Sequence, residues 1–174
     1  MRALQQLIWI IGKYLNENEL FYAYTGKFSL QLYGIHTPFT DLDILLNVTD
    51  DDREKLKRYL LREGFEKESE TKKILCLVDK ESRYKFFFKY ALEKFELQTI
   101  SRRIKLDYFY TTIYVSSVED LIFSELFCGN EDNALTLYKG WRSHLDISYM
   151  LKSAQEMNFY KKFVKLRIKG DRGL

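Results

Sequence analysis

Apolar residues near the start of the chain recur with the period of one helix face. Leu4, Leu7, Ile8, Ile11 and Leu15 follow the spacing of three to four residues that a helix needs to bury one side. The pattern predicts an amphipathic helix over residues 3–15, packed on the rest of the fold.

The next segments alternate between strand and helix signals. Residues 21–24 are aromatic-rich and precede a glycine, which predicts a strand, and residues 27–33 predict a short helix. Residues 34–40 contain the only proline and predict a loop into a strand over residues 41–48. Residues 50–63 then predict a helix that starts after the capping residue Thr49 and stops at Gly64.

The rest of the chain is expected to complete the sheet and then become helical. Strands are predicted over residues 73–78, 94–100 and 103–110, whereas residues 82–92 fit a strand or a helix. A capping signal at Ser117 opens a helical stretch that reaches about Phe163 and breaks near residues 129–133. We therefore predict an α/β (α+β) fold with a mixed β-sheet and packed helices over residues 1–112, followed by a helical C-terminal segment over residues 113–174.

The composition indicates a folded globular protein but does not indicate which molecule it binds. A chain of 174 residues with 46% hydrophobic and 30% charged residues is typical of a folded domain with a small appendage. The net charge of +3 does not by itself indicate nucleic acid, and the basic residues after Lys161 fit either phosphate contacts or a solvated helix face. Cys76 and Cys128 are widely separated, and the apolar run at residues 7–11 is too short for a membrane span. These features predict a cytoplasmic protein with no membrane partner.

Two acids on one predicted strand are the first candidates for chemistry. Side chains alternate along a strand, so Asp41 and Asp43 are expected on one face while Leu42 and Ile44 enter the core. A magnesium ion takes oxygen ligands and is usually held by one or two carboxylates together with substrate phosphates. The pair predicts a site for Mg²⁺, with Mn²⁺ as the alternative.

A third acid is expected on a neighbouring strand. Asp107 alternates with Ile104, Leu106 and Tyr108, and three acids that converge on one face are best sustained by a divalent cation. The alternative is an edge-strand aspartate that faces solvent. We predict Asp41, Asp43 and Asp107 as catalytic residues and metal ligands.

The turn before the short helix predicts a phosphate contact. A glycine at position 26 lets the backbone approach an anion closely, while Lys27 adds a positive charge and Ser29 a hydroxyl donor. Thr40, directly before Asp41, completes the predicted nucleotide-binding set of Gly26, Lys27, Ser29 and Thr40. The alternative is an ordinary turn between a strand and a helix.

Together these residues resemble a known superfamily. Gly26 to Leu30, Gly34 and the Asp41-Leu42-Asp43 segment resemble the nucleotidyltransferases with the DNA polymerase β-type fold, and most of all AbiEii-like toxins or minimal nucleotidyltransferases. The resemblance covers roughly residues 20–112. It implies transfer of a nucleoside monophosphate from an NTP to a hydroxyl of RNA, such as tRNA, or of a protein, with an antitoxin as partner. Asp41 and Asp43 would hold metal on the triphosphate, and Asp107 would join the metal that activates the acceptor.

Two positions depart from the toxin pattern and keep other functions open. Thr37 stands where many toxins of this kind have arginine, and Glu125 where the following helix commonly has lysine. These departures suit a non-catalytic nucleotide-binding module of the same fold. A third reading is a small-molecule nucleotidyltransferase of the aminoglycoside type, although Arg102, Arg103 and Lys105 beside Asp107 favour an anionic acceptor.

Overall fold

The computed structural model describes residues 2–172, and within them seven strands form one mixed sheet. The strands are β1 (Phe21–Thr25), β2 (Asp41–Asn47), β3 (Phe65–Glu70), β4 (Ile74–Asp79), β5 (Lys85–Tyr90), β6 (Ile104–Tyr108) and β7 (Thr111–Val115). The helices are α1 (Leu4–Glu17), α2 (Gly26–Leu32), α3 (Asp50–Arg62), α4 (Lys94–Ser101), α5 (Val118–Phe127), α6 (Glu131–Trp141), α7 (Ile147–Glu156) and α8 (Tyr160–Asp171), with a 3₁₀ turn, η1, at Arg142–His144. The predicted fold class is confirmed.

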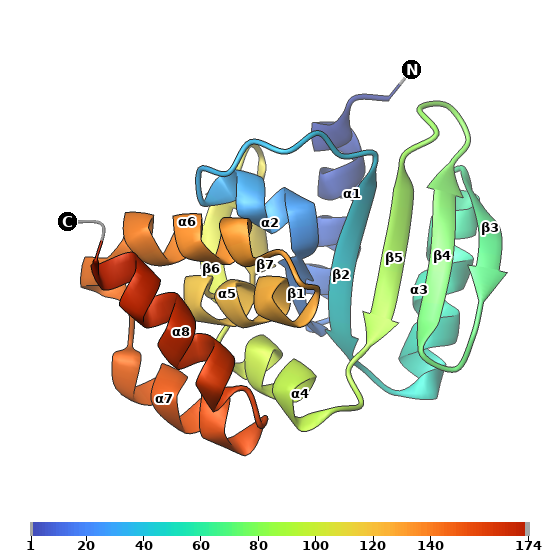
Figure 1. Cartoon of the computed structure of the whole chain (residues 1–174). Helices are drawn as coiled ribbons and strands as arrows, with labels where there is room; N and C mark the ends of the chain where they lie inside the picture. The colour runs from blue at the N-terminus through green and yellow to red at the C-terminus, as the bar shows by residue number, and fades with distance from the viewer. Residues whose placement is uncertain (1, 173–174) are drawn as a thin grey trace. The chain divides into compact units, whose positions relative to one another are not determined.

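Strand β2 lies at the centre of the sheet. The strand order is β3-β4-β5-β2-β1-β7-β6, so three strands lie on each side of β2 (Figure 1). Strand β2 runs antiparallel to β1 and parallel to β5. Leu42, Ile44 and Leu46 are completely buried, which anchors the strand that carries the two predicted acids.

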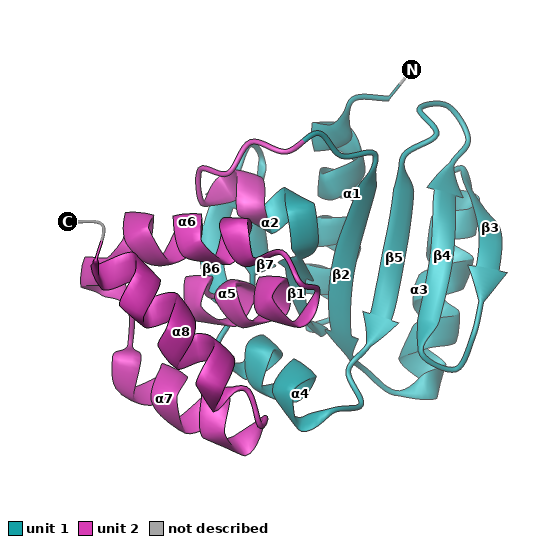
Figure 2. Cartoon of the chain, in the orientation of Figure 1, with its two compact units in different colours: residues 1–29, 38–116 teal, residues 30–37, 117–174 magenta. Residues whose placement is uncertain are grey.

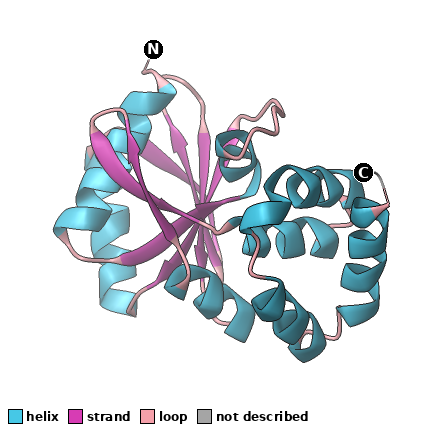
Figure 3. Cartoon of the chain, turned by 90° about the vertical axis from the view of Figure 1, so that its left-hand side faces the viewer, coloured by secondary structure: helices cyan, strands magenta, loops and turns pink. Residues whose placement is uncertain are grey.

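Helices of the N-terminal part of the chain lie on both faces of the sheet. On one face lie α1 and α3 (Figure 3). The Tyr14 and Tyr59 rings of these two helices stack with centroids 4.4 Å apart. On the opposite face Ile100 of α4 packs in a buried cluster with Ala23 and Leu45. Leu45 and Asp43 point to the same face of β2. The apolar cluster of α4 on Leu45 therefore lies next to the acids along this face.

The chain forms two compact units (Figure 2). The first contains the described residues up to Ser29 and Pro38–Ser116, and therefore the whole sheet. The second contains Leu30–Thr37 and the chain from Ser117 onward. The division after Ser116 lies a few residues beyond the predicted boundary at residue 112, and the second unit also takes a segment from the loop before β2.

The second unit is built from the four helices α5 to α8. Its core includes Phe123 of α5 and Phe163 of α8, whose ring centroids are 5.6 Å apart. Glu125 is buried, and its carboxylate accepts a hydrogen bond of 2.8 Å from the Asn133 amide of α6. Glu125 therefore joins two helices of this unit. Across residues 2–172 no helix is long and apolar enough to cross a membrane.

One predicted strand is a helix. Residues 94–100 lie in α4, because the Glu96 carboxylate accepts hydrogen bonds from the backbone N–H groups of Leu92 and Glu93 at 2.8 and 2.9 Å and so caps the helix start. The ambiguous segment 82–92 contains strand β5. Strands β3 and β7 were not predicted. Strand β3 is almost entirely polar and mostly exposed, and β7 spans the predicted boundary at residue 112.

Candidate functional site

Asp41 and Asp43 lie side by side on one face of β2, as the alternation of its residues requires. Their side chains are 34% and 20% exposed, whereas Leu42 and Ile44 on the other face are fully buried. The buried residues fix the strand, and the strand fixes the direction of both carboxylates. The two acids therefore present oxygen atoms to solvent from a rigid element.

Gly26 lies directly against Asp43. Thr25 of β1 pairs with Asp43 across the antiparallel ladder, so the turn that follows Thr25 begins beside this acid. The backbone of Gly26 has φ +63°, and a Cβ atom added there would lie 2.4 Å from Asp43 Oδ2. A side chain at this position would force the Asp43 carboxylate to shift, and the positive φ by itself favours glycine at this turn.

Two lysine side chains reach the two acids. Lys27 Nζ lies 3.8 Å from Asp41 Oδ1, and Lys89 Nζ lies 2.8 Å from Asp43 Oδ1. Lys27 follows Gly26 in α2, whereas Lys89 comes from β5, the parallel neighbour of β2. Each carboxylate thus has a cationic partner within residues 2–172.

The other two predicted nucleotide contacts differ in their access to solvent. Thr40 is exposed, and its carbonyl accepts a hydrogen bond of 3.0 Å from the backbone N–H of Lys85. Ser29 is fully buried, and its hydroxyl has no hydrogen-bond partner among the described residues. The contact of Ser29 with a nucleotide stays a prediction.

Asp107 does not join the other two acids, which corrects the predicted triad. It lies on the edge strand β6, three positions from β2 in the sheet order, or about 14 Å at the usual spacing between strands. Its carboxylate accepts a hydrogen bond of 3.2 Å from the Thr112 hydroxyl of β7. No group of three potential ligands among His, Cys, Asp and Glu is found within residues 2–172. The prediction failed because a strand's place in the sheet does not follow from its own alternation.

The basic residues near Asp107 follow α4 and continue into β6. Lys105 is on β6, and the Arg103 guanidinium lies between two aromatic rings, 4.8 Å from the centroid of Phe21 and 4.7 Å from that of Tyr114. Its Nη1 also donates to the Ile100 carbonyl at 2.9 Å. Arg103 therefore holds local structure, which removes it from the residues that favoured an anionic acceptor.

The side chains at β2 suit one divalent cation. Asp41 and Asp43 supply hard oxygen ligands, Gly26 leaves the room that Asp43 occupies, and the Lys89 ammonium already lies where a cation would contact Asp43. A second metal would need a further carboxylate, and the strands next to β2 supply none. In β5 the residues that share the face of the acids are Lys85, Phe87 and Lys89, and in β1 they are Phe21, Ala23 and Thr25.

Lys89 is the site residue that the sequence did not reveal. It belongs to the segment that fitted a strand or a helix, so no face could be assigned to it. The alternation of Lys85, Phe87 and Lys89 with buried Phe86 and Phe88 was the available signal. Knowledge of the strand order was needed to connect that alternation with Asp43.

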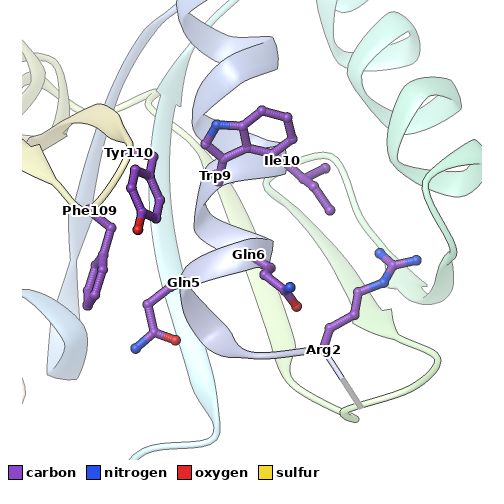
Figure 4. A pocket seen from close by; sticks show the side chains of 7 residues that line it. All are labelled: Arg2, Gln5, Gln6, Trp9, Ile10, Phe109 and Tyr110. Carbon is purple, nitrogen blue, oxygen red and sulfur yellow. The ribbon is translucent and has the colours of Figure 1, made fainter.

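An apolar groove in the first unit lies away from these acids. It is lined by Arg2, Gln5, Gln6, Trp9 and Ile10 from the start of the chain and by Phe109 and Tyr110 of the turn between β6 and β7 (Figure 4). Phe109 has φ +51°, which is unusual for a bulky residue. None of the predicted site residues lines this groove.

Comparisons identify the fold. No protein-family model matches the sequence, and neither does any curated protein. Among solved structures, the antibiotic-resistance factor ANT(2″)-Ia aligns over 97% of both chains with a TM-score of 0.62 and 13% identity. The lincosamide adenylyltransferase LnuA aligns over 78% of this chain and 98% of its own, with a TM-score of 0.55 and 14% identity. A nucleotidyltransferase-like protein of Paracoccidioides brasiliensis aligns over 94% and 92%, with a TM-score of 0.54 and 14% identity. The chain has the nucleotidyltransferase fold.

Proposed function

We propose that this chain is a metal-dependent nucleotidyltransferase that transfers a nucleoside monophosphate from an NTP to a hydroxyl group. One observation carries the proposal: Asp41 and Asp43 lie on one face of a central strand, and Gly26 lies against Asp43 at the start of the next element. The nucleotidyltransferase fold over almost the whole length of ANT(2″)-Ia supports it.

Each residue has a defined task in this proposal. A divalent cation, Mg²⁺ or Mn²⁺, would supply charge neutralisation on the triphosphate, held by Asp41 and Asp43. Lys27, which is half exposed beside Asp41, would contact a phosphate oxygen, and Thr40 would line the same opening. The acceptor oxygen forms a bond to the α-phosphorus while the bond to the β-phosphate oxygen breaks and pyrophosphate leaves. The acceptor proton passes to Asp41, the more exposed carboxylate.

Two classes of acceptor follow from different observations. RNA or a protein is the acceptor that the resemblance to toxins implies, together with an antitoxin as partner. A small-molecule hydroxyl is the second candidate, and it is favoured by the similarity in fold to ANT(2″)-Ia, whose complex with adenylyl-2″-tobramycin is known, and to LnuA, which was solved with lincomycin.

A non-catalytic nucleotide-binding module is a further candidate. The specific observation in its favour is that both acids of the site carry lysine partners while Asp107 lies three strands away. Such a module would bind Mg·NTP through the same residues and release it unchanged.

The test is transfer of label from each of the four α-³²P-NTPs to cellular RNA, cellular protein, aminoglycosides and lincosamides, with Mg²⁺ or EDTA. We expect Mg²⁺-dependent labelling of one acceptor class, lost in Asp41→Asn and Asp43→Asn. Asp107→Asn is the matched control and should label normally.

Calorimetry with NTP and Mg²⁺ separates the remaining cases. Binding without labelling of any acceptor would favour the module. Absence of both binding and labelling, or labelling that persists in Asp41→Asn and Asp43→Asn, would refute the proposed site. Co-purification of the chain with the product of an adjoining reading frame would test the antitoxin.

A further inference from the structure

Lys89 reaches Asp43 from β5, the parallel neighbour of β2. Strands β2 and β5 are parallel, and Lys89 lies opposite Leu45, one position along the same face from the pair of Asp43 and Phe87. Its side chain extends back along the strand to bring Nζ to 2.8 Å from Asp43 Oδ1. The contact is partly shielded, since the Lys89 and Asp43 side chains are 38% and 20% exposed.

The neighbouring lysine on β5 behaves differently. Lys85 lies opposite Asp41 in the same register, but its ammonium binds Glu68 of β3 at 2.6 Å. The two lysines share a strand and a face, and only Lys89 has its ammonium on an acid of the proposed site. A place on this face of β5 is therefore not enough to bring a lysine to the acids. The Lys89 side chain contacts Asp43 because it extends toward β2.

An ammonium group and a divalent cation compete for the same carboxylate oxygen. A metal that binds Asp43 must displace Lys89 Nζ or lie close to it, and positive charges a few ångströms apart repel each other even in water. The partial burial of the pair strengthens this effect, because solvent screens it less.

We propose that Lys89 is a built-in counter-ion of Asp43 that competes with the divalent cation and keeps the metal affinity of the free chain low. This inference rests on the proposed function, because it assumes that Asp43 is a metal ligand. It adds a residue that regulates metal binding, and it explains how the site stays neutral without metal. A triphosphate would supply the negative charge that receives the displaced ammonium, so metal and nucleotide should bind cooperatively.

The experiment is a titration with Mn²⁺ in the absence of nucleotide, followed by the loss of the free Mn²⁺ signal in electron paramagnetic resonance. Lys89→Met removes the ammonium and keeps an unbranched side chain one atom shorter, and Lys89→Glu replaces the ammonium with a carboxylate. We expect Lys89→Met to bind Mn²⁺ roughly tenfold more tightly than the unmodified chain, and Lys89→Glu more tightly still. Lys85→Met is the matched control and should change the affinity less than twofold.

The outcomes separate this inference from the proposed function. If Lys89→Met and Lys89→Glu bind Mn²⁺ as the unmodified chain does, while Asp43→Asn loses binding, the counter-ion role is refuted and the metal site stands. If Asp43→Asn binds Mn²⁺ as well as the unmodified chain, Asp43 is not a ligand and both proposals fail. If Lys85→Met tightens binding as much as Lys89→Met, general charge explains the effect and the specific role of Lys89 is refuted. Circular dichroism of each variant verifies that it is folded.

Discussion

Gly26 and Asp43 are in closer contact than any side chain at position 26 would allow, since a Cβ atom there would lie 2.4 Å from Asp43 Oδ2. We predict that Gly26→Ala abolishes Mg²⁺-dependent nucleotide binding, because the carboxylate must turn away. It should also lower the free energy of unfolding by about 2 kcal/mol, since an L-residue is strained at φ +63°. Calorimetry with Mg·NTP and urea unfolding measure the two effects.

Gly34→Ala is the matched control for that change. Gly34 also has a positive φ, +91°, but a Cβ atom there meets nothing within 4 Å. It should lower stability by about 1 kcal/mol and leave nucleotide binding intact. Equal losses of binding in both variants would mean that backbone strain, and not the contact with Asp43, controls the site.

Asp107→Ala should leave nucleotide binding and label transfer unchanged. The residue lies on β6, three strands from β2, and its carboxylate bonds to Thr112. Asp43→Asn, measured in parallel by calorimetry and labelling, should lose both activities. A large loss in Asp107→Ala, in a variant that remains folded, would restore the triad predicted from the sequence.

Thr49→Ala should destabilise the start of α3 by about 1 kcal/mol. The Thr49 hydroxyl accepts from the Asp52 backbone N–H at 3.2 Å and donates to the Asp52 carboxylate at 2.6 Å, which lowers the pKa of Asp52 below its ordinary value of 3.8. A lowered pKa stabilises the fold above pH 3.8, and the contribution is lost as the pH falls through the folded value. Urea unfolding of both chains at pH 7 and pH 2.5 should therefore give a smaller difference at pH 2.5.

Thr49→Ser retains the hydroxyl and serves as the control for that prediction. Its urea midpoint should stay close to that of the unmodified chain at both pH values. A loss in Thr49→Ser as large as in Thr49→Ala would point to the methyl group of Thr49 in place of its hydrogen bonds.

The two cysteines should differ in their reactivity. Burial, together with the hydrogen bond of 3.2 Å to the Glu68 carboxylate, raises the pKa of the Cys76 thiol to about 11, whereas Cys128 is exposed. Since only the thiolate reacts, iodoacetamide at pH 8 should alkylate Cys128 and leave Cys76 mostly free in the folded chain. Peptide mass spectrometry reads out both sites, and 8 M urea should make them equivalent. Rapid alkylation of Cys76 without urea would contradict the buried position of β4.

The sequence predicted those parts of the site that lie close together along the chain. Asp41, Asp43, Gly26 and Lys27 fall within two adjacent elements, and local periodicity was enough to assign their faces. Asp107 and Lys89 depend on the order of strands in the sheet, which is decided by contacts between distant segments. Periodicity assigns a residue to a face, but it does not assign a strand to a neighbour.

The errors in secondary structure also have local physical causes. The apolar positions in residues 94–101 fit the period of a strand as well as that of a helix. The capping hydrogen bonds of Glu96 stabilise the helix. Strand β3 has only one buried side chain, Phe65, so it lacked the alternation on which a strand prediction depends. Its backbone pairing with β4 holds it in the sheet.

The composition of β3 has a consequence for association between molecules. An edge strand presents unpaired backbone N–H and C=O groups, which can recruit a strand of another chain and start aggregation. From Glu66 to Glu70 every residue of β3 except Ser69 is charged, and Lys67 forms an ion pair with Glu70. An incoming apolar strand would have to desolvate these charges. The same charged side chains that leave β3 without an alternating hydrophobic pattern thus protect this edge of the sheet against extension by a second molecule.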